Sequence, residues 1–151
     1  MSSPNDDLKL TVDKFVFRFP KELQYTEAGL WIRQEDSLLR IGMSDFAQQR
    51  NGDVAFATLL PAGLVLDAGD EIAAIETVKV NISLPSPVKG KVVEINSYLH
   101  ESPELINLDP YGKGWIAVIQ PENPDGDLSG LMSAEAYLTL AWQQAEAELT
   151  S

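Results

Sequence analysis

The 151-residue sequence contains no cysteine and only one histidine, and these two shortages exclude several kinds of site. Without cysteine the chain has no disulfide, no thiol nucleophile and no thiolate ligand for a metal. His100 falls in a loop expected over residues 98–103, where a solvated imidazole is a simpler interpretation than a member of a Ser-His-Asp triad. Carboxylates alone would have to hold a metal, and no calcium-loop spacing is complete. We therefore expect neither a metal centre nor catalysis by the chain on its own.

Basic side chains are also scarce, since 11 Lys and Arg residues stand against 23 Asp and Glu and give a formal net charge of -12. The phosphates of nucleic acids require clustered Lys and Arg, so this balance argues against a nucleic-acid partner. It favours docking on basic surfaces of partner proteins, although solubility alone is an alternative explanation. No segment approaches the roughly 18 apolar residues of a membrane-spanning helix, and the first residues lack the apolar core of a signal peptide. We expect a cytoplasmic protein that does not contact membranes.

The length of the chain suits one domain with a core of its own. We expect residues 1–14 to form a flexible N-terminal tail and residues 15–151 to form the domain. Within it, short segments rich in Val, Ile and Ala alternate with turn residues, a pattern typical of a small β-sandwich or flattened barrel. The expected strands cover residues 14–20, 31–33, 38–42, 54–60, 71–78, 80–84, 88–95 and 115–119.

Two helices are expected. Ser44 is a suitable N-cap for a short helix that ends at Asn51-Gly52. Ser133 is a suitable N-cap for a longer C-terminal helix, with Glu135 in its first turn, where a negative charge is favourable. Apolar side chains recur there at helical spacing and predict a face that packs on the β-core: Ala134, Tyr137, Leu138, Ala141, Trp142, Ala145 and Leu149.

One lysine is isolated in an acidic segment of the sequence. Between Asn51 and Val88, Lys79 is the only basic residue, and five carboxylates surround it. Val78 and Val80 flank it, and we expect it at the tip of a hairpin, whose paired strands hold the base rigid and project the side chain. Such isolation suits an enzyme that must modify a single amine. The plainer interpretation is a charge that protects a β-turn from aggregation.

Several motifs occur in the order in which lipoyl domains have them. The segment 63–70 resembles the turn into the carrier hairpin of that family, 75–79 resembles its attachment site, and 86–92 resembles the start of its second half. Within that superfamily, segments 42–48 and 101–115 closely resemble the glycine-cleavage H protein. The chain is therefore identified as similar to H-like lipoyl carriers.

The resemblance covers about residues 25–142 and implies a mainly β fold. This fold is a barrel-sandwich hybrid of two small antiparallel sheets, with a short helix after the first strands and a C-terminal α-helix. The resemblance also implies that lipoic acid is joined to Lys79 through an amide and forms a swinging arm that visits successive enzymes. A lipoate-protein ligase or lipoyl transferase would attach it, and we expect Glu76, Thr77 and Val78 to help that enzyme recognise the hairpin. The chain would be a carrier protein and not an enzyme.

Three residues depart from the pattern of the H proteins. The family usually has His-Glu-Trp in the first strand, where this chain has Leu30 in the middle position, and an acid four residues after the lysine, where it has Ser83. Arg50 stands where the family tends to have a small polar or imidazole side chain. The resemblance places all three in the cleft that receives the arm. Leu30 and Ser83 cannot hold an amine cargo, and a cation at Arg50 would repel an aminomethyl group and attract an anionic or thiolate cargo.

Two carrier functions follow, and these departures favour the first. The first is a lipoate-binding protein of sulfur oxidation, with a heterodisulfide-reductase-like complex and dihydrolipoamide dehydrogenase as partners. The alternative is a glycine cleavage system H protein that carries aminomethyl-lipoate between glycine decarboxylase and aminomethyltransferase. A third hypothesis is a binding module that keeps the fold without the lipoyl group, for which an unmodified Lys79 in native cells would be the sign.

Overall fold

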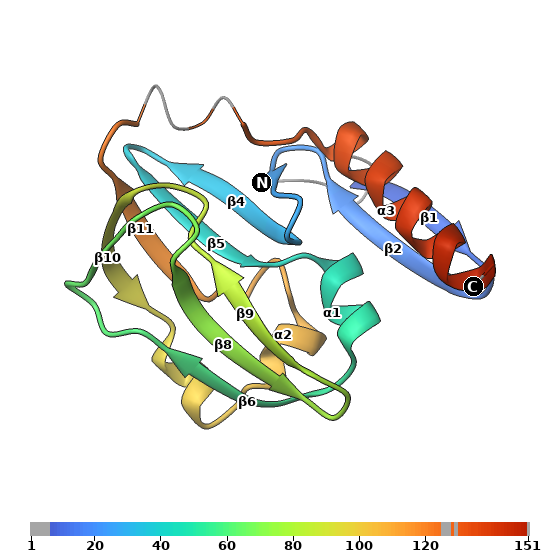
Figure 1. Ribbon diagram of the computed structural model, residues 1–151, viewed down its shortest axis with the longest axis horizontal. Helices are drawn as coiled ribbons and strands as arrows, with labels where there is room; N and C mark the ends of the chain where they lie inside the picture. The colour runs from blue at the N-terminus through green and yellow to red at the C-terminus, as the bar shows by residue number, and fades with distance from the viewer. Residues whose placement is uncertain (1–6, 125–127, 129, 151) are drawn as a thin grey trace.

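The computed structural model describes residues 7–124, 128 and 130–150, and its chain is mainly β with one long helix (Figure 1). Within these described residues all strand pairs are antiparallel, and they form three sheets. The mainly β barrel-sandwich prediction is therefore confirmed. The largest sheet has six strands, in the spatial order β3 (Gln24–Tyr25), β4 (Leu30–Glu35), β5 (Leu38–Met43), β11 (Ala117–Pro121), β10 (Gly90–Ile95) and β7 (Val65–Leu66).

A three-stranded sheet faces the six-stranded one and supplies the other half of the sandwich. Its strands are β6 (Val54–Leu59), β8 (Glu71–Thr77) and β9 (Asn81–Pro85). Successive side chains of a strand point to opposite faces of the sheet, and Ala73, Ile75 and Thr77 of β8 accordingly point inward while Glu76 is exposed. The residues of both sheets share one core of Leu, Ile, Val, Met and Ala side chains. We call this aliphatic cluster the sandwich core.

Both predicted helices are confirmed, together with their caps. In α1 (Asp45–Asn51) the Ser44 hydroxyl accepts a hydrogen bond from the Ala47 amide at 3.1 Å. Gly52 follows with φ of 87°, a left-handed value that glycine adopts without steric cost. Ser133 caps α3 (Ala134–Thr150) in the same way, because its hydroxyl accepts from the Ala136 amide at 3.1 Å. Polar caps therefore set where both helices begin.

The packing face of α3 differs in one position from its prediction. Tyr137, Ala141 and Ala145 are buried as expected, but Trp142 is 44% exposed. The side chain of Leu149 lies outside the described residues. One face of the helix thus packs, and the indole lies beside that face in contact with solvent.

Two short helical elements are present that the sequence did not predict. The predicted loop at residues 98–103 overlaps a 3-10 helix, η2 (Ser97–His100), and a four-residue helix, α2 (Leu105–Leu108), follows it. His100 is exposed. Elements of one turn are too short to show an apolar periodicity, so only the tertiary structure reveals them.

The predicted tail over residues 1–14 is wrong for its second half. Residues 7–12 form β1 (Asp7–Val12), which pairs with β2 (Phe15–Pro20) along its whole length, and residues 1–6 lie outside the described part. The turn uses Asp13 at φ of 56°, a left-handed conformation that Asp tolerates. The alternation of apolar and polar side chains from Leu8 to Val12 was a strand signal that the tail prediction overlooked. We call residues 7–20 the N-terminal hairpin.

The N-terminal hairpin and α3 lie side by side on one flank of the molecule, with α1 between them and the sandwich (Figure 1). Their contact surfaces form a second cluster that is rich in aromatic rings. Phe17 meets Phe46 edge to face at 5.0 Å between ring centroids, and Tyr25 stacks on Tyr137 at 4.8 Å. The Tyr137 hydroxyl is also hydrogen-bonded to Ser44 at 2.7 Å. We call this cluster the aromatic core.

Candidate functional site

Lys79 lies at the tip of the β8–β9 hairpin, as the sequence predicted. The tip is held by Thr77, whose buried hydroxyl accepts hydrogen bonds from the amides of Lys79 at 3.2 Å and Val80 at 3.0 Å. The Thr77 hydroxyl also donates to the Val80 carbonyl at 3.0 Å, and the Val78 amide donates to the Asp53 carbonyl at 3.1 Å. These bonds fix the backbone of the turn while the Lys79 side chain stays exposed. The arrangement presents a mobile amine on a rigid base.

The residues expected to guide a ligase take different positions. Glu76 is exposed and Val78 is 73% exposed, so both can contact a modifying enzyme directly. Thr77 is buried, and its contribution is to the shape of the turn. The sequence pattern did not distinguish these two kinds of contribution, because the side chain of a turn residue can point either way.

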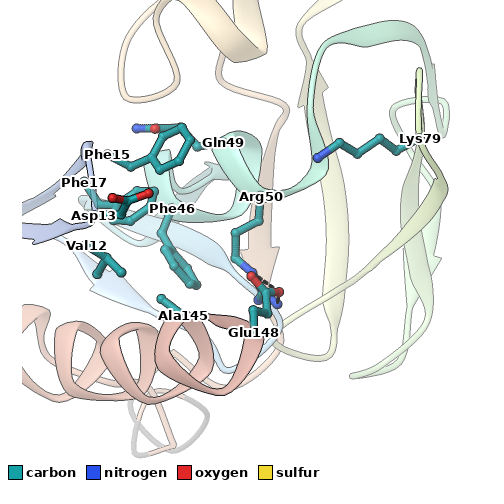
Figure 2. Close-up of a pocket in the computed structure, with 10 residues that line it drawn as sticks. All are labelled: Val12, Asp13, Phe15, Phe17, Phe46, Gln49, Arg50, Lys79, Ala145 and Glu148. Atoms are coloured by element: carbon teal, nitrogen blue, oxygen red, sulfur yellow. Dashed lines mark hydrogen bonds and ion pairs between the residues drawn. The ribbon is translucent and has the colours of Figure 1, made fainter. Parts of the chain in front are cut away.

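The Lys79 side chain extends toward α1 and lines a pocket of about 230 Å³ (Figure 2). It passes above Gly52, where a Cβ atom would stand 3.6 Å from the Lys79 Cδ atom. Lys79 makes no ion pair with the described residues. The remaining lining residues come from three other segments, namely the N-terminal hairpin (Val12, Asp13, Phe15 and Phe17), α1 (Phe46, Gln49 and Arg50) and α3 (Ala145 and Glu148).

Arg50 shares this pocket with Lys79, but its charge is already paired. Its guanidinium forms an ion pair with Glu148 (Figure 2), with Nε at 3.0 Å from Oε1, and donates to the Gln144 amide oxygen at 3.0 Å. The guanidinium carbon also lies 5.1 Å from the centre of the Phe46 ring. α3 therefore neutralises the cation that the sequence analysis treated as repulsive to an amine.

Leu30 and Ser83 do not belong to this pocket. Leu30 is fully buried in the sandwich core, so the prediction that it lines an arm cleft is wrong for this conformation. Ser83 is exposed on β9, opposite Ala74 of β8, and does not line the pocket. Of the three predicted cleft residues, the structure brings only Arg50 near Lys79.

Two carboxylates that the sequence analysis missed lie in the pocket. Asp13 stands at the turn of the N-terminal hairpin, and Glu148 lies one helical turn after Ala145 on the same face of α3. The i, i+3 spacing of Ala145 and Glu148 was a readable signal. Nothing in the sequence, however, indicated that the two segments meet.

No metal-binding group of three or more His, Asp or Glu side chains occurs among residues 7–124, 128 and 130–150. Burial raises the pKa of Tyr137 to about 12, and it also raises the pKa of Tyr25 and Tyr111 above the ordinary value. These phenols lie in or against the aromatic core and serve packing. The chemistry of the pocket therefore rests on the lysine amine and its charged neighbours.

Comparison with known proteins gives one consistent result. A family model described as "Glycine cleavage H-protein" matches residues 23–144. The glycine cleavage system H protein of Oceanobacillus iheyensis is 45% identical over 118 residues, which cover 78% of this chain and 93% of that protein. The H protein of Carboxydothermus hydrogenoformans is 41% identical over 127 residues, which cover 84% and 97%.

A solved structure agrees with these sequence matches. The crystal structure of a glycine cleavage system H protein from Mycobacterium marinum aligns with a TM-score of 0.72 at 29% identity, covering 83% of this chain and 98% of that one. These relatives support the alternative of the two carrier hypotheses. They lend no support to sulfur oxidation or to a heterodisulfide-reductase-like partner, which were the preferred interpretation of the sequence.

Proposed function

This chain belongs to the glycine cleavage H-protein family, and from that premise we propose that it carries the aminomethyl group of a glycine cleavage system on a lipoyl arm at Lys79. Proteins of the family hold lipoate covalently on a lysine and act as carriers without catalysing the reactions themselves. The chain is accordingly a lipoyl carrier. Its cargo and the identity of its lysine are the proposal.

The observation that carries the proposal is the geometry of Lys79. Its amine is exposed, makes no ion pair with a described residue and projects from a turn whose backbone is fixed by the Thr77 hydroxyl. An amide at this amine loses no ion pair and needs no rearrangement of the turn. A modifying enzyme can therefore dock on the rigid hairpin and reach one lysine.

The charges of the pocket support an amine cargo. Acylation removes the positive charge of Lys79, which leaves one cation, Arg50, and two carboxylates, Asp13 and Glu148, among the lining residues. The net charge of these three is -1, and Arg50 is paired with Glu148. An ammonium group near the pocket is therefore attracted and not repelled. The departure at Arg50, which had favoured an anionic cargo, no longer argues against the glycine pathway.

When bound, the lipoyl group supplies a disulfide. Joined to Lys79 and surrounded by Arg50, Asp13 and Glu148, it would supply an acceptor for both the aminomethyl carbon and the electron pair that decarboxylation of glycine releases. The protein keeps this arm attached while it visits glycine decarboxylase, aminomethyltransferase and dihydrolipoamide dehydrogenase, which we propose as its partners together with a lipoate ligase or lipoyl transferase. Tethering keeps the arm at a high local concentration at each enzyme in turn. The acidic surface favours fast, salt-sensitive docking to basic partner surfaces.

Mass spectrometry of the native protein tests the site and the cargo separately. Intact mass and peptide mapping should place one lipoyl group on Lys79, and Lys79→Arg should abolish it while Lys91→Arg, an exposed strand lysine, leaves it unchanged. Incubation with glycine decarboxylase and carbon-labelled glycine should then add a labelled aminomethyl group to the wild-type arm. Lipoylation elsewhere would overturn the site, and a lipoylated arm that gains no label would overturn the cargo. An unmodified Lys79 from cells that lipoylate other proteins would instead indicate a binding module.

A further inference from the structure

The N-terminal hairpin is basic on a protein that is otherwise acidic. The hairpin and the residue after it hold four of the 11 Lys and Arg residues, namely Lys9, Lys14, Arg18 and Lys21. Between Lys9 and Lys21 only Asp13 is acidic, whereas the whole chain has a formal net charge of -12. The family match begins at residue 23, after this segment. The hairpin therefore adds a surface of opposite charge that the matched segment does not include.

Most of these cations are free to bind an anionic group. Lys9, Lys14 and Lys21 are exposed and form no ion pair with a residue that the structure describes. Arg18 pairs with Asp7 at 2.7 Å, and its side chain is still 56% exposed. Lys9 stands directly opposite Arg18 in the β1–β2 register, so both side chains lie on the solvent face of the hairpin.

The outer backbone edge of β2 is closed by side chains. The Gln49 side-chain amide donates to the Val16 carbonyl at 3.0 Å. The Arg18 amide donates to the Asp45 carboxylate at 2.9 Å, and the Arg18 carbonyl accepts from the Tyr111 hydroxyl at 2.6 Å. The polar backbone groups of Val16 and Arg18 therefore point away from β1.

The outer backbone edge of β1 is open. In the register of the hairpin, Lys9 stands opposite Arg18 and Thr11 opposite Val16. Opposite residues of an antiparallel pair either exchange both hydrogen bonds or point their N–H and C=O groups away from each other. The groups of Lys9 and Thr11 consequently point away from β2, and they form no hydrogen bond with another described residue. Such an edge is a template on which a further strand can form.

A strand added to this edge would meet a different surface on each face. On the solvent face its side chains would lie beside Lys9. On the other face they would lie beside Leu8, Leu10 and Val12, which are half-buried against the aromatic core. Opposite charges on neighbouring strands stabilise a sheet and like charges destabilise it. The edge therefore suits a segment in which acidic and apolar side chains alternate.

We propose that β1 is a docking edge for an extended acidic segment of a partner protein, which adds to it as an antiparallel strand with carboxylates beside Lys9. Main-chain hydrogen bonds supply the affinity, and Lys9 supplies the preference for acidic side chains. The proposal goes beyond the carrier function and does not depend on what Lys79 carries, because Lys9 and Thr11 do not line its pocket.

Two forms of one peptide separate strand pairing from attraction between charges. The probe is a capped peptide, Glu-Val-Glu-Val-Glu-Val. In the proposed pairing its glutamates stand opposite Lys9 and Thr11 and direct their N–H groups toward β1, while the N–H groups of its valines point away. One form is methylated on the valine nitrogens, which keeps the pairing edge, and the other on the glutamate nitrogens, which removes its donors.

The form methylated on valine should bind the full-length protein at least about tenfold more tightly, as loss of two or three hydrogen bonds implies. Isothermal titration calorimetry measures both dissociation constants. The two forms have the same charge and the same side chains. Equal affinities would mean that charge alone attracts the peptide, and failure of the valine-methylated form to bind would mean that the edge accepts no such strand. Either result overturns the proposal.

A proline in β1 tests the edge from the side of the protein. Thr11→Pro removes an outward N–H, and proline is tolerated on an edge strand where that N–H faces solvent. The variant should bind the valine-methylated peptide about tenfold more weakly than the wild type. Thr11→Val is the matched control, because it keeps the N–H and should bind as the wild type does. Thermal unfolding checks that both variants fold, and unchanged binding by folded Thr11→Pro would overturn the proposal.

Reversal of one charge tests the preference for acid without a change to the backbone. Lys9→Glu should weaken binding of the same peptide about tenfold, since an attraction between neighbouring strands becomes a repulsion. Lys91→Glu makes the same change of net charge at an exposed lysine of β10, in another sheet, and should have little effect. Equal losses in the two variants would assign the effect to net charge and would contradict a site at β1.

Two other occupants of the hairpin predict different results. A dimer of the wild type in sedimentation experiments that Thr11→Pro dissociates would mean that a second copy of the chain covers β1. Binding to phosphatidylserine vesicles that Lys9→Glu abolishes and Thr11→Pro leaves unchanged would mean that the cations serve an anionic lipid surface. Either result would replace the acidic segment as the occupant, whereas a monomer that ignores vesicles supports it. Lipoylation of Lys79 is measured separately, so failure of one proposal leaves the other standing.

Discussion

The two hydrophobic cores of this protein differ in composition and in what they position. The sandwich core is aliphatic and lies between two sheets that are almost wholly inside the segment matched to the H-protein family. The aromatic core joins the N-terminal hairpin, α1 and α3, and part of it lies outside that segment. The first core holds the β8–β9 hairpin from which Lys79 projects, and the second shapes the pocket toward which Lys79 points. The proposed attachment point and its surroundings are thus supported by separate parts of the molecule.

This separation means that the surroundings of the arm can change without moving the attachment point. β8 is anchored by Ile72 and Ile75, which do not belong to the aromatic core. Phe15, Asp13 and Glu148 can therefore be replaced while the turn at Lys79 keeps its hydrogen bonds. The difference between the two cores also predicts whether a mutation destabilises the N-terminal hairpin or the β8–β9 hairpin.

The largest effect is expected in the aromatic core. Phe19 is fully buried and meets the Tyr137 and Tyr25 rings edge to face, so Phe19→Ala should lower the free energy of unfolding by about 3–5 kcal/mol. Urea unfolding measures the loss. Amide hydrogen exchange should become faster in the N-terminal hairpin and should change little in β8 and β9. Faster exchange throughout both sheets would show that the two cores are one cooperative unit.

In the sandwich core, the substitution that corresponds to Phe19→Ala is Ile75→Ala. Ile75 is fully buried beneath the Lys79 hairpin, and Ile75→Ala should cost about 2–5 kcal/mol in the same urea experiment. Exchange should then become faster in β8 and β9 but not in β1 and β2. Val78→Ala is the exposed control on the same hairpin and should change stability by less than about 0.5 kcal/mol.

High pH should weaken the aromatic core before the sandwich core. Burial raises the pKa of Tyr137 to about 12, above the value of about 10 in an unfolded chain, so the folded state keeps the phenol proton longer. Its contribution is complete below about pH 10 and is lost as the pH rises toward 12, by about 2–3 kcal/mol. Unfolding by urea from pH 8 to 12 measures this loss. Tyr137→Phe removes the group that titrates, so its stability should decline less steeply. A slope equal to that of the wild type would assign the loss to other groups.

The smallest effects are expected from two similar ion pairs. Arg50 pairs with Glu148 and lies over Phe46, while Arg40 pairs with Glu35 and lies over Trp115. Side chains exposed to this degree contribute little, so Arg50→Gln should lower the free energy of unfolding by at most about 1 kcal/mol. Arg40→Gln is the matched variant and should cost more, because its side chain is 23% exposed against 33% for Arg50. Thermal unfolding at low and high salt measures the stability of both variants. A larger loss of stability for Arg50→Gln than for Arg40→Gln would mean that α3 depends on the pair of Arg50 with Glu148.

Much of the fold could be read from the sequence because its signals are local. Runs of Val, Ile and Ala between turn residues marked strands such as β8, and Ser44, Gly52 and Ser133 marked helix ends through hydrogen bonds and backbone conformations that span a few residues. The hairpin signal at Leu8 to Val12 was equally local, and it was overlooked because a polar N-terminus suggested a tail. The short elements η2 and α2 had no periodicity to detect.

The candidate site also has one part that local sequence predicts and another part that only tertiary contacts determine. Lys79 could be predicted as the attachment site because its isolation and flanking motifs lie in one segment, and the hairpin around it follows from runs of Val, Ile and Ala and from turn chemistry. Leu30 was misplaced, and Asp13, Phe15 and Glu148 were missed, because their positions depend on contacts between segments separated by up to 135 residues. Packing of aromatic rings between the N-terminal hairpin, α1 and α3 brings these segments together. Local chemistry therefore specified the lysine that we propose is modified, while only long-range burial of apolar surface decided what surrounds it, since that burial depends on shape complementarity that no short stretch of sequence contains.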